Sequence, residues 1–200
     1  MSSNSGSQRE EPPAQVPKQV TVGVANLANS LTILRIVIVP FFVYALFHHD
    51  GTSYFWRYVA TALFALASYT DRVDGQLARN RNTVTDFGAL LDPIADKALI
   101  GSALIGLSHL GQVAWWVTIV ILIREFGITI LRLVVLRRGV IPASRGGKAK
   151  TMVQGLAIFF YLWPLPALVN PARVALMAAA VLLTVLTGLD YLKNAIRRTD

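Results

Sequence analysis

Four aspartates near the middle of the chain have a spacing that could bring their carboxylates to one point. Asp71 and Asp74 are three residues apart, and Asp92 and Asp96 are four residues apart, so each pair shares a face if its segment is helical. A fifth aspartate, Asp86, stands where it would cap the second of these helices. The chain has only 11 acidic residues, so the cluster calls for a chemical explanation.

Clustered carboxylates repel one another unless cations neutralise them. Mg²⁺ and Mn²⁺ prefer carboxylate and water oxygens, and two such ions close together serve displacement reactions at phosphorus. We therefore predict that the four aspartates bind two Mg²⁺ or Mn²⁺ ions. Gly75 and Gly88 would let a bulky ligand approach the backbone, and Arg79 could hold a phosphate with forked hydrogen bonds. For a single aspartate such as Asp71, pairing with a neighbouring cation is the simpler explanation.

The elements that must position these residues are apolar enough to cross a membrane. The chain is 54% hydrophobic and 15% charged, whereas soluble domains carry roughly a quarter charged residues. A membrane-crossing helix needs roughly 20 apolar residues, and lipid offers no partners for unpaired backbone groups. We predict an all-α integral membrane protein with six transmembrane helices, at residues 31–47, 55–71, 88–108, 113–136, 151–168 and 172–192.

The basic residues predict the orientation of these helices. If the connections alternate between the two sides, fourteen Lys or Arg residues lie on one side and only Arg57 and Arg173 on the other. The positive-inside rule then puts both termini, and the aspartate cluster, on the cytoplasmic side. Cytoplasmic loops that meet anionic lipid headgroups explain the net charge of +8, so we expect no nucleic-acid partner.

The chain is expected to form one domain preceded by a tail. Residues 1–25 are rich in Ser, Gln and Pro without apolar periodicity, which predicts a disordered tail and no signal peptide. Residues 26–195 are expected to form the six-helix domain. There is no cysteine, which excludes disulfides and cysteine-based catalysis or metal binding.

A second polar cluster lies in and after the fourth predicted helix. Charges inside an apolar run, such as Arg124, Glu125 and Arg132, are functional candidates by default. With Lys148 and Lys150, the two arginines could form a pocket for an anion. Two alternatives stay open. Glu125 could simply pair with Arg132, while Arg124 has no evident local partner, and the basic segment that follows could be an ordinary cytoplasmic loop.

The aspartate region resembles the signature of a known family. Its pattern is Asp71-x2-Asp74-Gly75-x2-Ala78-Arg79-x8-Gly88-x3-Asp92-x3-Asp96, which is similar to that of the CDP-alcohol phosphotransferases, integral membrane enzymes of phospholipid synthesis. The resemblance implies that a CDP-linked lipid donates its phosphatidyl group to an alcohol and CMP leaves. It implies that all four aspartates bind the metal ions, with Asp96 also the catalytic base for the acceptor hydroxyl. It also implies that the CDP site is lined by Gly75, Ala78, Arg79 and Gly88.

Further stretches resemble one branch of that family. These are SLTILRIVIVPFF at 30–42, DPIADK at 92–97, REFGITILR at 124–132 and GKAKT at 147–151. They are similar to the phosphatidylglycerophosphate synthase branch, which uses CDP-diacylglycerol and sn-glycerol 3-phosphate. The acceptor phosphate would then occupy the basic pocket. Thr32, in the first stretch, could contact the donor head group or only cap its helix. The same resemblance leads us to expect a homodimer.

Other functions remain compatible with these residues. Sister enzymes, the inositol-phosphate and cardiolipin synthases, share parts of the same stretches. A cation transporter would also carry acids within the membrane, but here the acids are expected at one face rather than at the midplane. A non-catalytic CDP-lipid binder would keep Gly75, Arg79 and Gly88 but would not need Asp96.

Overall fold

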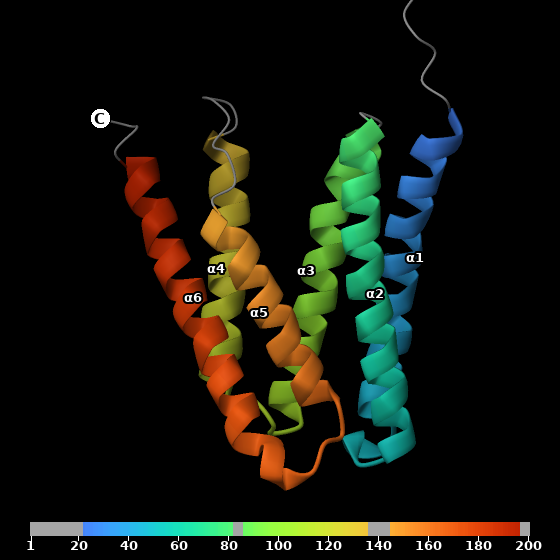
Figure 1. The fold of residues 1–200 in the computed structure, drawn as a ribbon, viewed down its shortest axis with the longest axis vertical. Coiled ribbons are helices and arrows are strands. Elements are labelled where there is room, and N and C mark those ends of the chain that lie inside the picture. The colour runs from blue at the N-terminus through green and yellow to red at the C-terminus, as the bar shows by residue number, and fades with distance from the viewer. Residues whose placement is uncertain (1–21, 82–85, 136–144, 197–200) are drawn as a thin grey trace, which may run out of the picture.

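The computed structural model describes the backbone of residues 22–81, 86–135 and 145–196, and the side chains of residues 32–70, 94–130 and 149–193. Within these ranges the chain forms helices and no strand. The α-helices are α1 (Val22–Phe47), α2 (Tyr54–Arg81), α3 (Asp86–His109), α4 (Trp115–Val135), α5 (Arg145–Leu162) and α6 (Asn170–Ile196), and the 3-10 helices are η1 (His48–Gly51) and η3 (Ala167–Val169). Figure 1 shows the α-helices running side by side along the length of the molecule.

The all-helical prediction is confirmed for the described residues, although several helix ends differ. α1 begins at Val22 and α2 continues to Arg81, both well beyond the apolar segments predicted at 31–47 and 55–71. Hydropathy marks the part of a helix that suits lipid, whereas the hydrogen-bonded helix can extend into polar sequence. α1 therefore includes residues 22–25, which were expected to belong to the tail; residues 1–21 lie outside the described residues.

The fifth helix differs most from its prediction. It was predicted at 151–168, but α5 spans Arg145–Leu162. Pro164 and Pro166 follow its end. Proline has no N–H to donate and disfavours the helical conformation of the residue before it. The predicted end is therefore wrong because the apolar run at 163–168 contains residues that cannot continue a helix.

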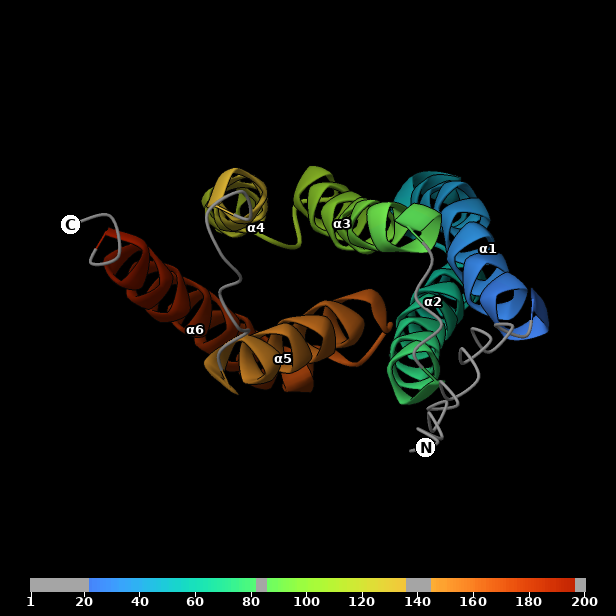
Figure 2. The same ribbon diagram turned by 90° about the horizontal axis from the view of Figure 1, so that it is seen from above.

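The helices share one apolar core. α1 packs against α2 and α3, α5 packs against α2 and α6, and α4 contacts both α3 and α6; the view from above shows this arrangement (Figure 2). Five of these helices contribute large side chains that are at most 1% exposed, namely Phe42, Phe64, Leu104, Ile121 and Ile158. Buried alanines on α1, α2, α3, α5 and α6 let the helices approach closely.

The outward faces of the helices are also apolar. Phe41, Ile123, Ile130 and Leu182 are 62%, 68%, 60% and 59% exposed, respectively. Exposed apolar surface on this scale suits contact with lipid rather than water. In the described part of the chain, Thr32–Gly51 and Ala167–Lys193 are long and apolar enough to cross a membrane, and α5 contains a shorter apolar stretch, Ala149–Leu162.

The two ends of the bundle differ in what they contain. The upper end in Figure 1 holds the last turns of α2, α4 and α6 and the first turns of α1, α3 and α5. We call it the motif end, because the aspartate pattern spans the end of α2 and the start of α3. The lower end holds the connections α1–α2, α3–α4 and α5–α6, and we call it the connection end.

Candidate active site

The two halves of the aspartate pattern lie at the same end of the molecule. The α2 half consists of Asp71, Asp74, Gly75, Ala78 and Arg79, and the α3 half of Gly88, Asp92 and Asp96. α2 and α3 contact each other, and both halves lie at the motif end (Figure 1). Both segments are helical, as the spacing argument requires. Apart from Asp96, the side chains of this pattern lie outside the described ones.

Asp96 lines a small cavity of about 20 Å³ at which three helices meet. The aspartate is half-buried. The other lining residues come from α3, α4 and α5, and they are Lys97, Ile100, Leu122, Glu125, Phe126, Lys150, Thr151 and Gln154. The cavity therefore joins the expected catalytic base to the second polar cluster, which is separated from it in the sequence.

Lys150 is a buried cation in this cavity. Its side chain is 2% exposed, and its Nζ forms an ion pair with Oε1 of Glu125. Removing an ammonium group from water is unfavourable unless an opposite charge and hydrogen bonds compensate it. Glu125 supplies that charge, and it thereby holds the Lys150 ammonium group on the same cavity that Asp96 lines.

Arg124 contacts Glu125 from another direction. Its Nη1 is 3.6 Å from Oε1 of Glu125, and its Nη2 donates a hydrogen bond of 3.0 Å to Oγ1 of Thr187 on α6. The Thr187 hydroxyl in turn donates to the carbonyl of Leu183 at 2.6 Å. The sequence offered Arg124 no evident local partner, and α6 supplies a hydrogen-bond partner that is distant in the sequence.

The described contacts of Glu125 are with residues other than Arg132, the partner that one alternative gave it. Its ion-pair partners among the described side chains are Lys150 and Arg124. The backbones of Arg132 and Lys148 lie in α4 and α5 towards the motif end, but their side chains are outside the described ones. Glu125 therefore connects two of the four residues that we predicted to bind the acceptor phosphate.

Two further polar residues of this region were not found from the sequence. Gln154 is 3% exposed and follows Lys150 by one helical turn, and Thr151 lines the same cavity. An amide four residues after a lysine in an apolar stretch was the available signal. Thr32, the predicted donor-site residue on α1, is 2% exposed, so it lies within the helix packing.

The residues of the pattern suit a hard divalent cation. Four carboxylates offer only oxygen ligands, which Mg²⁺ and Mn²⁺ prefer, and the helices carry all four towards one end of the bundle. No group of three or more His, Asp or Glu residues gathers among the described side chains. Asp71, Asp74 and Asp92 lie outside that set, so the fit rests on ligand chemistry and on the shared location.

Comparisons with known proteins cover nearly the whole helical region. The model of the CDP-alcohol phosphatidyltransferase family matches residues 25–186. A Mycobacterium tuberculosis (strain ATCC 25618 / H37Rv) protein named "Probable phosphatidylglycerophosphate synthase" is 60% identical over 174 residues, which are 87% of this chain and 83% of that protein.

More distant relatives carry a related name. Proteins named "CDP-diacylglycerol--glycerol-3-phosphate 3-phosphatidyltransferase" are 37% identical in Bacillus subtilis (strain 168), over 83% of this chain and 93% of the relative. The protein of that name in Escherichia coli (strain K12) is also 37% identical, over 85% of this chain and 94% of the relative. The resemblance drawn from the aspartate pattern is confirmed, and the chain belongs to the CDP-alcohol phosphatidyltransferase family.

Proposed function

We propose that this protein transfers the phosphatidyl group of CDP-diacylglycerol to sn-glycerol 3-phosphate, and releases phosphatidylglycerol phosphate and CMP. The names of the relatives at 60% and 37% identity support this choice of donor and acceptor. The structural observation that carries it is the cavity that joins Asp96 to the buried Lys150. A phosphorylated alcohol needs a base for its hydroxyl and a cation for its phosphate, and these two residues are suited to provide them.

The reaction exchanges one phosphorus–oxygen bond for another. The acceptor hydroxyl oxygen attacks the phosphorus that carries the diacylglycerol, and the bond from this phosphorus to the oxygen shared with the second phosphate breaks. CMP leaves with the electron pair of that bond. Asp96 takes the proton of the attacking hydroxyl, a role that suits a half-buried carboxylate on the small cavity that it shares with Lys150.

The four aspartates Asp71, Asp74, Asp92 and Asp96 would hold two Mg²⁺ or Mn²⁺ ions. When bound, such ions neutralise charge on the phosphoryl oxygens during displacement. Gly75 and Gly88 leave room for the CDP group, and Ala78 continues the face of α2 that carries the aspartates.

Polar and basic side chains would bind the phosphate-bearing groups of the donor and of the acceptor. Arg79 would bind the donor diphosphate, and Thr32 would complete the CDP site from α1. Arg124, Arg132, Lys148 and Lys150 would bind the phosphate of the acceptor. The ion pairs of Glu125 with Lys150 and Arg124 support this assignment, because they keep two of these cations beside the cavity.

We further propose six membrane crossings, with both termini and the motif end in the cytoplasm, and a homodimer as the functional assembly. The exposed apolar faces of the helices and the bias of Lys and Arg between the two sides support the topology. A cytoplasmic motif end would give the site access to water-soluble glycerol 3-phosphate and to release of CMP.

Release of CMP tests the function directly. Purified protein would receive CDP-diacylglycerol and Mg²⁺ with labelled glycerol 3-phosphate, and in parallel reactions with inositol phosphate, phosphatidylglycerol or serine. We expect CMP release with glycerol 3-phosphate, and its loss when a chelator removes the divalent cation. Release with another acceptor alone would identify a sister enzyme. No release with any acceptor would favour a transporter or a non-catalytic CDP-lipid binder.

A further inference from the structure

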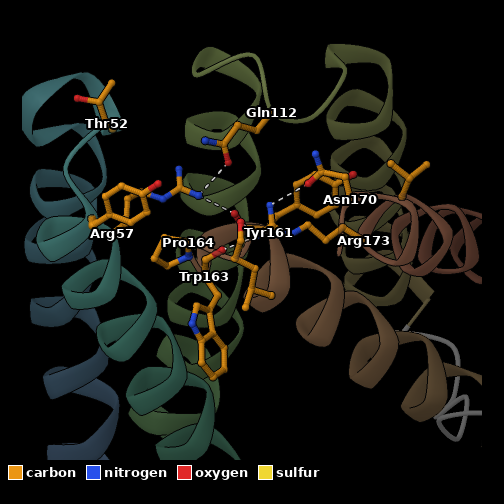
Figure 3. Close-up of a pocket in the computed structure, with 12 residues that line it drawn as sticks. Thr52, Arg57, Gln112, Tyr161, Trp163, Pro164, Asn170 and Arg173 are labelled. Atoms are coloured by element: carbon orange, nitrogen blue, oxygen red, sulfur yellow. Dashed lines mark hydrogen bonds between the residues drawn. The ribbon is translucent and has the colours of Figure 1, made fainter. Parts of the chain in front are cut away.

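A second, larger cavity of about 430 Å³ lies at the connection end, opposite the aspartates. The connections α1–α2, α3–α4 and α5–α6 all contribute to its wall, through residues that include Thr52, Gln112 and Pro164. Figure 3 shows the polar side chains that face one another there. The transfer reaction described above uses none of these residues.

Arg57 forms one wall of this cavity. It is 5% exposed, and its guanidinium group donates a hydrogen bond to the carbonyl of Leu162 at 3.1 Å. It also donates to the carbonyl of Tyr161 at 2.6 Å and to Oε1 of Gln112 at 2.9 Å (Figure 3). All three acceptors are neutral groups. They hold the guanidinium group in place without cancelling its charge.

Arg173, from the first turns of α6, faces the same segment from the other side (Figure 3). Its Nη2 donates to the carbonyls of Trp163 at 2.7 Å and Leu165 at 3.4 Å, and its Nη1 to Oδ1 of Asn170 at 3.4 Å. These acceptors are neutral as well. The connection between α5 and α6 is therefore held between two fixed guanidinium groups.

The two arginines leave this cavity with uncompensated positive charge. Among the described residues, neither Arg57 nor Arg173 forms an ion pair. Nη1 of Arg57 and Nε of Arg173 are buried and have no hydrogen-bond partner. The carbonyls at the end of α5 carry only about half an elementary negative charge, against two full positive charges. An arrangement of this kind is favourable when an anion binds.

The surroundings of the cavity place it at the depth of lipid headgroups. Helices begin and end around it, and all four tryptophans of the chain, Trp56, Trp115, Trp116 and Trp163, lie at or near helix ends on this side of the molecule. Tryptophan prefers the boundary between hydrocarbon and water. The anion of highest local abundance at that depth is the phosphate group of a phospholipid.

We infer that the cavity between Arg57 and Arg173 binds a phosphate group at the face of the membrane opposite the transfer site. The shared chemistry is that of a phosphate oxyanion, from a phospholipid headgroup or from free phosphate. Arg173, which is partly exposed on the cavity wall, would donate hydrogen bonds to it, and the charge of the more deeply buried Arg57 would add electrostatic attraction. A bound phosphate would also tie the α5–α6 connection to α2.

Tryptophan fluorescence gives a readout that is specific to this end of the molecule. Full-length protein in a non-ionic detergent would be titrated with dihexanoyl-phosphatidylglycerol, with inorganic phosphate and with dihexanoylglycerol, which lacks the phosphate. We expect a saturable change with the phospholipid and none with dihexanoylglycerol. Arg173→Gln should weaken the binding by about tenfold or more, because it removes one charged hydrogen-bond donor group.

Two further variants separate a bound phosphate from a general effect of charge or folding. Lys193→Gln removes one positive charge from the motif end of the same helix and should bind like the unmodified protein. Arg173→Lys should retain part of the affinity, and the melting temperatures of all variants would verify that they fold. A response to phospholipid alone identifies a headgroup site, and a response to inorganic phosphate identifies a site for free phosphate. No saturable response to either, or equal binding by R173Q, would overturn the inference.

Discussion

At the scale of single residues, the candidate site combines an acid and a buried cation on one small cavity. Asp96 is the residue of the aspartate pattern whose side chain the structure describes, and it shares the cavity with Lys150. Asp96 is the proposed base for proton transfer, and Lys150 is proposed to bind the acceptor phosphate. Separate substitutions should therefore affect turnover and acceptor affinity differently.

Asp96→Asn should remove turnover and leave the binding of CDP-diacylglycerol measurable. The amide keeps the size of the side chain but cannot accept the proton of the acceptor hydroxyl, and a positioned base contributes about 10²- to 10⁴-fold to rate. Initial rates of CMP release would measure the loss. Asp190→Asn, the same change at an exposed position of α6, should leave the rate unchanged. Near-normal turnover of D96N would refute its role as base.

Lys150→Gln should raise the KM for glycerol 3-phosphate by about tenfold or more and leave the KM for CDP-diacylglycerol nearly constant. A hydrogen bond to a charged group contributes about 1.5–3 kcal/mol, and the proposed contact is made with the acceptor alone. The KM values for the two substrates, measured separately, would test this. Equal increases in both would show that Lys150 does not distinguish donor from acceptor.

A double substitution separates recognition by Lys150 from its structural pairing. K150Q alone leaves Glu125 without its buried partner, and breaking such a pair destabilises a protein by about 3–5 kcal/mol. Glu125→Gln combined with Lys150→Gln removes both charges, so the melting temperature should recover towards that of the unmodified protein. The KM for glycerol 3-phosphate should stay high. Recovery of both properties would mean that Lys150 has only a structural role.

At the scale of elements, the close packing of α1 on α3 helps to fix the position of α3, and α3 contains half of the aspartate pattern. Gly106 of α3 has no room for a side chain: a Cβ there would lie 2.5 Å from Cδ2 of Leu46, which is fully buried in α1. The contact sits towards the connection end, so it sets the separation of the two helices before they reach the motif end.

Gly106→Leu should lower the melting temperature, since overpacking of a core typically destabilises by about 1–3 kcal/mol. Gly155→Leu on α5 is the matched control, because a Cβ at that position would meet nothing within 4 Å. It should leave the melting temperature unchanged or raise it, given the poor helix propensity of glycine. Thermal unfolding in detergent would compare the two, and equal shifts would argue against close packing at Gly106.

At the scale of the whole molecule, the aspartate pattern and the arginine-lined cavity lie at opposite ends of the bundle. The helical segments that carry the four aspartates lie at the motif end, and the arginine-lined cavity lies at the connection end. The proposed orientation puts the first in the cytoplasm and the second on the opposite side. The absence of cysteine from the chain makes this orientation simple to test.

A single cysteine at each end should react from opposite sides of the membrane. Thr52→Cys lies in the α1–α2 connection at an exposed position, and Ser144→Cys lies between α4 and α5. A membrane-impermeant maleimide added to intact cells should label T52C, whereas S144C should be labelled only after permeabilisation. The unmodified chain, with no thiol, serves as the blank. The reverse labelling pattern would show that the orientation is inverted. Labelling of both cysteines from the same side would exclude the proposed topology.

Much of the fold and part of the site could be predicted from local sequence. Apolar segments predicted each α-helix of the described part, though not the 3-10 helices η1 and η3, and the spacing of Asp71, Asp74, Gly88, Asp92 and Asp96 led to the family, which the comparisons confirm. Both are short-range properties, because a helix needs only its own backbone hydrogen bonds and a pattern needs only fixed spacing along it. The end of α5 was missed although Pro164 was visible.

By itself, the sequence determined the helical class, the family and the spacing of the acids along α2 and α3. Only the tertiary structure decided the partners of the buried charges: Glu125 with Lys150, Arg124 with Thr187, and Arg57 with the end of α5. The physical reason is that a buried charge must be compensated by whichever groups packing brings near it. Those groups come from helices distant in sequence, and no local spacing encodes which helices will meet.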